Sequence, residues 1–191
     1  MSEKEFMGAL SVAVGVASYA LYLWGVYRGN VRPHLFTWFI WGTLLSVGFA
    51  AQYAGNAGPG AWNTGVSAII TFAIAGTAYF RGEKHITRGD WIAFIIALSA
   101  IPVWRVTDNA LWAVIIVSAI DAMAFYPTFR KSWDKPREEA AFSFFMGSLQ
   151  FIFSIFALEN VTFTTALYPA IIVIMNVMLV LMLLYRRKVL K

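Results

Sequence analysis

The sequence predicts an all-α integral membrane protein with seven transmembrane helices, arranged as two parallel three-helix repeats joined by a linker helix. The composition, the number of apolar stretches and the distribution of basic residues support this prediction. Hydrophobic residues make up 60% of the 191 residues and charged residues 13%, with a mean hydropathy of +0.66. Soluble domains are about 45–50% apolar and about 25% charged, so the surplus apolar surface here requires lipid.

Seven stretches come close to the roughly 20 apolar residues that a membrane-spanning helix needs. They are expected near residues 6–27, 34–54, 60–80, 91–105, 109–129, 140–158 and 163–185. The first residues, MSEKEF, lack a basic segment and the first stretch has full spanning length, so no cleavable signal peptide is expected. The fourth stretch is short and has Pro102 near its end.

The basic residues indicate the orientation, because cytoplasmic loops carry an excess of Lys and Arg. With seven spans, the side opposite the amino terminus holds 13 basic residues, and the other side holds only Lys4 and Arg105. The larger set is Arg28, Arg32, Arg81, Lys84, Arg88, Arg130, Lys131, Lys135, Arg137, Arg186, Arg187, Lys188 and Lys191. The amino terminus is therefore expected outside and the carboxyl terminus in the cytoplasm. This argument also supports the fourth span, and it leaves no basic soluble face for nucleic acid.

Two segments resemble each other, ALYLWGVYRGNVRPH (20–34) and AMAFYPTFRKSWDKP (122–136). Each leaves an apolar helix through an aromatic residue and an arginine, reaches a proline, and is followed by an aromatic-rich helix. The third helix of each group also ends in an aromatic residue and an arginine. Both repeats start outside and are therefore parallel, as in some transporters. Chance similarity between aromatic-rich spans is the alternative.

This internal similarity predicts three parts of the chain. Residues 1–82 form the first triple-helix repeat, residues 83–106 the linker with the fourth helix, and residues 107–191 the second repeat. The two fused repeats already supply both bundles, so the protein is expected to be a monomer or a homo-oligomer.

The motif FYPTFRKSW…P, with helices grouped three-one-three, resembles the PQ-loop and SWEET-like superfamily, which includes sugar, amino-acid and vitamin carriers. The chain has Pro127-Thr128 where the motif has proline-glutamine, and Gly25-Val26 in the first repeat. The stretch RPHLFTWFIWG looks more like a bacterial branch, which implies a bacterial cytoplasmic membrane. The resemblance implies two bundles rocking around a central site, with hinge or gate residues Pro127, Gly25, Pro33 and Pro136. A static kink is the alternative.

Asp121 is the most informative single residue. It lies nine residues before Arg130, which places it roughly 13 Å deep at 1.5 Å per residue. An acid at that depth costs about 2.5–3.5 kcal/mol and is expected to face the bundle interior. It is interpreted as a proton-coupling group or a cation- or substrate-binding group. The alternative is a neutral, hydrogen-bonded acid between packed helices.

Similar counting places further polar residues near the same depth: Tyr19, Thr71, Gln150 and Asn176. Polar groups in lipid need partners within the protein, so a shared cavity is the simplest interpretation. The alternative is that they join helices by hydrogen bonds worth about 0.6 kcal/mol each.

Three further observations extend this candidate substrate site. Asn63, Ser67 and Thr71 recur every four residues and form one stripe. SWEET-like carriers use an asparagine pair on the third and seventh helices, which Asn63 and Asn176 resemble, although the two lie at different depths. The indoles of Trp38 and Trp41 could stack on a ring-shaped substrate, whereas interfacial anchoring is the alternative.

No catalytic or metal-binding motif is found at membrane depth, so no enzyme activity, cofactor or metal is expected. The only histidines, His34 and His85, lie at the cytoplasmic side, and the chain contains no cysteine. The predicted function is secondary transport or facilitated passage of a small polar metabolite, with proton coupling through Asp121 as one form. The expected partners are this substrate and membrane lipid. The alternatives are a receptor or scaffold, and a lipid-modifying enzyme that depends on cytoplasmic groups such as His34 or Glu139.

Overall fold

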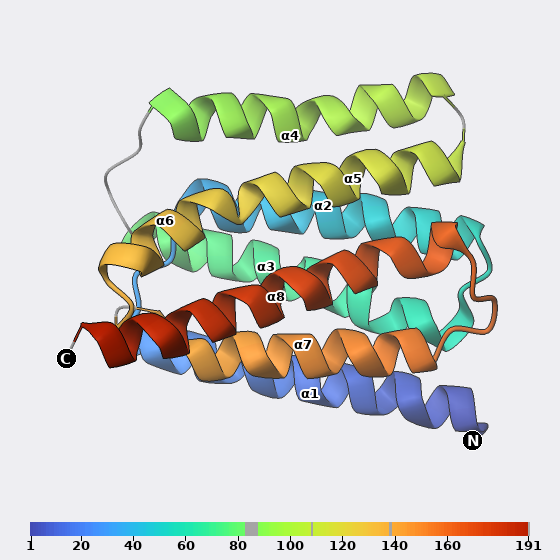
Figure 1. The fold of residues 1–191 in the computed structure, drawn as a ribbon. Coiled ribbons are helices and arrows are strands. Elements are labelled where there is room, and N and C mark those ends of the chain that lie inside the picture. The colour runs from blue at the N-terminus through green and yellow to red at the C-terminus, as the bar shows by residue number, and fades with distance from the viewer. Residues whose placement is uncertain (83–87, 108, 138, 191) are drawn as a thin grey trace.

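The computed structural model describes residues 1–82, 88–107, 109–137 and 139–190, and these ranges form helices joined by short loops (Figure 1). The elements are α1 (Glu3–Tyr27), α2 (Leu35–Ala54), the 3-10 turn η1 (Gly58–Ala61), α3 (Trp62–Arg81), α4 (Arg88–Thr107), α5 (Ala110–Ala124), α6 (Tyr126–Asp134), α7 (Ala141–Phe156) and α8 (Phe163–Val189). Lys84, His85 and Lys191, which are named above for their predicted cytoplasmic positions, lie outside the described residues.

Five described segments are long and apolar enough to cross a membrane. They are α1, α2, η1 with α3, α5 with α6, and α8. Helix α7 is apolar but has 16 residues, and α4 has 20 residues with Pro102 inside. The chain is therefore an all-α membrane protein, as its composition predicts.

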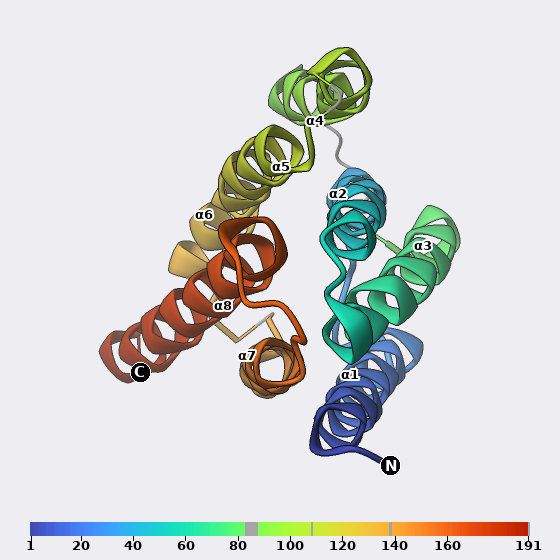
Figure 2. The same ribbon diagram turned by 90° about the vertical axis from the view of Figure 1, so that its right-hand side faces the viewer.

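The helices form two groups that face each other, with α4 at one edge beside α5 and α2 (Figure 2). In the first group, α3 packs against both α1 and α2. In the second group, α8 packs against both α5 and α7. Across the boundary, α1 contacts α7 and α2 contacts α5. The first helix of each group thus faces the second helix of the other.

The expected helix near 109–129 is longer than predicted and is interrupted. Its first part ends at Ala124, and α6 continues from Tyr126 to Asp134 after a break at Phe125. A proline has no backbone N–H for the carbonyl four residues earlier, so Pro127 explains an interruption within the preceding turn. The side chain of Pro127 lies outside the described part of the structure.

The seam between α1 and α7 is built from small and polar residues. Ser11, Gly15 and Ser18 are buried on one face of α1 at spacings of four and three residues, and Gly8, one turn before them, packs against Pro59 and Trp62. The Ser11 hydroxyl donates to the Gln150 carbonyl at 2.6 Å, and the Ser18 hydroxyl donates to the Ser143 carbonyl at 2.9 Å. Small residues let helix backbones approach closely in membranes, so this seam is the tight part of the boundary between the groups.

The two ends of the bundle differ in how the groups are joined. At the end that carries the amino terminus, the Glu159 N–H donates to the Ala57 carbonyl at 3.1 Å, and the Ser154 hydroxyl donates to the Gly60 carbonyl at 2.6 Å. These bonds connect the α2–α3 loop to the end of α7 and the loop that follows it. The end is therefore closed by hydrogen bonds between the two groups.

At the opposite end, described arginine contacts stay within one group. Arg81 donates to the Tyr27 carbonyl, and Arg187 donates to the carbonyls of Pro136 and Glu139. These arginine contacts thus stabilise each group separately.

Candidate functional site: a central cavity

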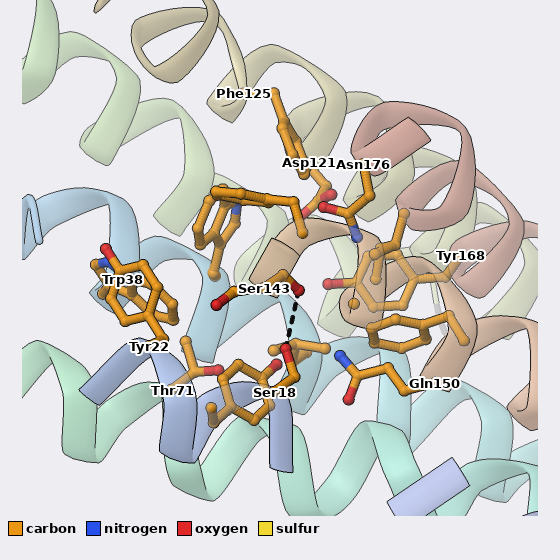
Figure 3. A pocket seen from close by; sticks show the side chains of 17 residues that line it. Ser18, Tyr22, Trp38, Thr71, Asp121, Phe125, Ser143, Gln150, Tyr168 and Asn176 are labelled. Atoms are coloured by element: carbon orange, nitrogen blue, oxygen red, sulfur yellow. Dashed lines mark hydrogen bonds between the residues drawn. The ribbon is translucent and has the colours of Figure 1, made fainter. Parts of the chain in front are cut away.

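A cavity of about 80 Å³ lies between the two groups, toward the arginine-rich half of α1, α2 and α7 (Figure 3). Described side chains from α1, α2, α3, α5, α7 and α8 line it. Seven of the nine residues predicted from the sequence to bind substrate line the cavity: Tyr19, Trp38, Trp41, Thr71, Asp121, Gln150 and Asn176. The structure thus brings together residues that were predicted from their positions along the chain. Their role in substrate binding stays a prediction.

Asp121 is buried at the wall of this cavity, with 2% of its surface exposed. Figure 3 shows its side chain next to that of Asn176, with Tyr168 and Gln150 on the same side of the cavity. The Tyr168 hydroxyl lies close enough to the carboxyl to interact with it electrostatically. Within the described part of the chain, Asp121 Oδ2 has no hydrogen-bond partner. One oxygen of this buried carboxyl group is therefore left without a hydrogen bond from the described side chains.

Several other polar atoms of the wall are also buried and unpartnered among the described residues. They are Trp41 Nε1 and the Thr71 and Tyr168 hydroxyls, whereas the unpartnered Gln150 Oε1 lies against Gly15 of α1. Buried polar groups in native proteins usually have partners, and each exception requires an explanation. A polar molecule inside the cavity would satisfy several of these atoms at once.

Aromatic rings from α1 and α2 form the other side of the cavity, and Phe125, one helical turn after Asp121, packs against them at Trp41. The Tyr22 and Trp38 ring centroids are 4.6 Å apart, those of Trp38 and Trp41 are 5.3 Å apart, and those of Trp41 and Phe125 are 5.1 Å apart. In Figure 3, Trp38 and Tyr22 lie across the cavity from Gln150 and Tyr168. The cavity therefore has a polar side and an aromatic side.

Glycines allow polar side chains to come close to neighbouring backbones at this site. A Cβ on Gly48 of α2 would lie 2.5 Å from Tyr168 Cδ1, and a Cβ on Gly147 of α7 would lie 3.2 Å from Asn176 Nδ2. A Cβ on Gly15 of α1 would collide with the Gln150 amide and approach Asn63. Larger residues at Gly48 and Gly15 would push the polar groups out of their observed positions.

Two residues of the predicted substrate site do not line the cavity. Asn63 and Ser67 are buried on α3, where the Ser67 hydroxyl donates to Asn63 Oδ1 at 3.5 Å. Asn63 packs beside Gly15 of α1. These residues therefore lie in helix–helix contacts within the first group, next to the wall and not in it.

The predicted hinge and gate residues lie toward the arginine-rich end, at the ends of helices or in loops. The Gly25 carbonyl accepts bonds from the Asn30 and Val31 N–H groups, so the last turn of α1 and the following loop fold around it. The Pro33 carbonyl oxygen lies next to Gly82. The Pro136 carbonyl accepts a hydrogen bond from Arg187 Nε. Hinge motion at these residues and at Pro127 stays a prediction.

Several lining residues were not among the predicted site residues, including Ser18, Tyr22, Ser143, Gly147 and Tyr168. Helical spacing contains a signal for most of them. Tyr22 follows Tyr19 by three residues, Gly147 precedes Gln150 by three, and Tyr168 precedes Asn176 by eight. Such spacings place residues on one helix face, so extending each nominated residue along its face finds them.

The chemical character of the site is that of a binding cavity with one carboxyl group. Among the described residues, no group of three or more His, Asp or Glu side chains is arranged to hold a metal ion. Asp121 is the one lining side chain among those described that carries a carboxyl group.

No protein-family model, no curated protein and no solved structure matches this chain.

Proposed function

We propose that this protein is a secondary transporter or facilitator of a small polar metabolite, which crosses the membrane by alternating access to the central cavity. The observation that carries the proposal is the cavity itself. It lies between two helix groups, and Asp121, Thr71 and Tyr168 present unpartnered polar atoms in its wall. A bundle that served only as a scaffold would gain stability by pairing or removing such atoms.

We further propose the seven-span, three-one-three arrangement with parallel repeats, in which α4 and α7 also cross the membrane. Two features support this arrangement. Helices α3 and α8 hold matching positions within their groups, and α1 contacts α7 as α2 contacts α5. The arrangement fits the PQ-loop and SWEET-like superfamily. The proposed location is a bacterial cytoplasmic membrane, with the amino terminus outside.

The hydrogen bonds that close the amino-terminal end indicate from which side of the membrane a substrate would reach the cavity in this conformation. Cross-group bonds at Ala57, Gly60 and Lys4 join the groups at the amino-terminal end, and the Lys4 ammonium donates to the Phe156 carbonyl at 2.7 Å. The cavity lies toward the other end, where the described arginine bonds stay within one group. In the proposed orientation, this conformation would receive substrate from the cytoplasm.

Within this function, Asp121 would couple a proton or bind the substrate directly, and Asn176 and Gln150 would donate and accept hydrogen bonds. Trp38 and Trp41 would contact the apolar part of the substrate. Replacing any one of these residues should therefore lower the ligand affinity or the transport flux while the protein remains folded.

The test is uptake into proteoliposomes, with candidate ligands first chosen by thermal shift from sugars, amino acids, vitamins and nucleosides. A ligand at about 100 times its dissociation constant stabilises a protein by roughly 2.7 kcal/mol. Asp121→Asn and Asn176→Ala should abolish the shift and the flux. The matched control is Ser118→Ala, a buried polar residue on α5 that does not line the cavity. Unchanged flux in both site variants would refute the site, and stoichiometric co-purification of a partner without any flux would favour a scaffold.

A further inference from the structure

The hydrogen-bonding character of the polar side restricts what the cavity can hold. Asp121 Oδ2 has no hydrogen-bond partner among the described residues, and the residue is only 2% exposed. The oxygens of an ionised carboxylate only accept hydrogen bonds. A ligand that satisfies this carboxylate must bring donors, positive charge or both.

The charge of the wall restricts the ligand further. Among the described residues, no lysine, arginine or histidine side chain lines the cavity, so Asp121 has no counter-charge there. An unpaired buried charge is strongly unfavourable, and the cost falls when an opposite charge pairs with it. A cationic ligand supplies that charge, whereas a phosphate or a carboxylate would be repelled by Asp121.

The aromatic side favours a rounded cation over a flat ring. Trp38 and Trp41 are nearly perpendicular, with an interplanar angle of 83°, and the angle between Trp41 and Phe125 is 47°. A flat ring stacks best between parallel faces, which these residues do not form. Aromatic faces are negative and attract cations within about 6 Å of the ring centroid, so rings in several planes suit a compact ion with apolar groups.

We propose that the ligand of this cavity is a small organic ammonium ion, held between the Asp121 carboxylate and the aromatic side formed by Trp38 and Trp41, with Phe125 packed against Trp41. This inference takes its site from the proposed function and names the class of substrate. The volume of about 80 Å³ is smaller than the cavities of about 150 Å³ that hold benzene in other proteins, so the ion is compact.

Binding is measured by titration calorimetry on detergent-purified protein with three compounds of matched shape. They are trimethylammonium (cationic), tert-butanol (neutral) and pivalate (anionic), and tetramethylammonium serves as a second cation. The two ammonium ions should bind, tert-butanol should bind at least tenfold more weakly, and pivalate should not bind. Asp121→Asn should weaken trimethylammonium binding at least tenfold.

Trp41→Leu tests the aromatic side separately and does not change the buried acid. It should weaken ammonium binding roughly 2- to 30-fold, the range expected for loss of a cation–π contact. The matched control is Trp112→Leu, because Trp112 lies on α5 with 56% of its surface exposed and does not line the cavity. Size-exclusion profiles and thermal unfolding establish that each variant is folded.

The inference is overturned if tert-butanol binds folded wild-type protein as tightly as trimethylammonium, if neither ammonium ion binds, or if Trp112→Leu weakens binding as much as Trp41→Leu. Flux of a neutral metabolite without ammonium binding would overturn the inference and leave the transport proposal intact. Ammonium binding without flux of any compound would support the inference and count against transport.

Discussion

The guanidinium of Arg186 lies 4.4 Å from the ring centroid of Trp133 and donates a 2.8 Å hydrogen bond to the carbonyl of the same residue. Arg81 has the same relation to Tyr27, with a guanidinium–ring distance of 5.2 Å and a hydrogen bond of 3.3 Å. Both arginines lie near the end of the last helix of their group, and both aromatic residues lie near the end of its first helical segment. The same contact thus joins the first and last helices of each group at the arginine-rich end.

Arg186→Ala should destabilise the protein by about 1 kcal/mol, the range for an exposed cation–π contact together with a partly exposed hydrogen bond. Arg81→Ala should cost less, because its two distances are longer. The measurement is a double-mutant cycle of Arg186→Ala with Trp133→Leu, followed by denaturant unfolding in detergent. A coupling energy near zero would show that the contact contributes nothing to stability.

Gly15→Ala should destabilise the bundle by about 1–3 kcal/mol, the usual cost of overpacking a filled interior. Its new methyl group would meet the Gln150 amide and the Asn63 side chain. Gly76→Ala is the matched control, since nothing lies within 4 Å of the methyl position and the glycine is also inside a helix. Thermal unfolding of both variants should show a clear loss for Gly15→Ala and no loss for Gly76→Ala.

Gly48→Ala should weaken ligand binding more than it weakens the fold. The added methyl group would lie 2.5 Å from the Tyr168 ring and must displace it from the cavity wall. Affinity measured for any ligand of the cavity should fall at least several-fold, and the Gly76→Ala control should bind like wild type. Equal binding by Gly48→Ala and wild type would place the bound ligand away from Tyr168.

Ser11→Ala and Ser18→Ala should each cost about 0.6 kcal/mol, the mean for a hydrogen bond between helices in a membrane. Each removes one bond across the α1–α7 seam. Ser46→Ala is the control, because the Ser46 hydroxyl donates only within its own helix, to the Gly42 carbonyl. Unfolding free energies that are lower for both seam variants than for the control would support the seam, and three equal values would argue against it.

The natural chain has no cysteine, so single cysteines test the proposed topology directly. Cysteines at Ser2, Asn109 and Val161 should react with a membrane-impermeant thiol reagent added to intact cells. Cysteines at Gly29, Asp134 and Val189 should react only after the membrane is opened. The Asn109 result tests the fourth span in particular, because protection at that position would place both ends of α4 on the same side.

Much of the fold follows from composition, because the excess of apolar residues allows little other than spanning helices. The ends of α2 and α3 lie within two residues of their expected positions. The longer extent of α6 was not predicted, since its polar sequence YPTFRKSWD does not resemble a membrane span.

The site was predicted in part, because counting residues from a helix end estimates depth but not direction around the helix. Asp121, Gln150 and Asn176 have both the depth and the direction of the cavity. Asn63 and Ser67 share a stripe with Thr71, but Thr71 alone of the three lines the cavity, and Asn63 lies against Gly15 of α1. The spacing from Asn176 points to Tyr168, but the packing of its ring against Gly48 joins distant parts of the chain, and no local pattern contains that contact.

The serine bonds of the α1–α7 seam have a consequence for motion. Ser11 and Ser18 donate to carbonyls of the other helix, while Ser46 and Ser148 donate to the carbonyl four residues back in their own helix. A helical serine can exchange one kind of acceptor for the other by rotating its side chain. If α1 and α7 separate, both hydroxyls can remain hydrogen-bonded without water, so the seam can part and re-form without exposing a lone polar group to lipid.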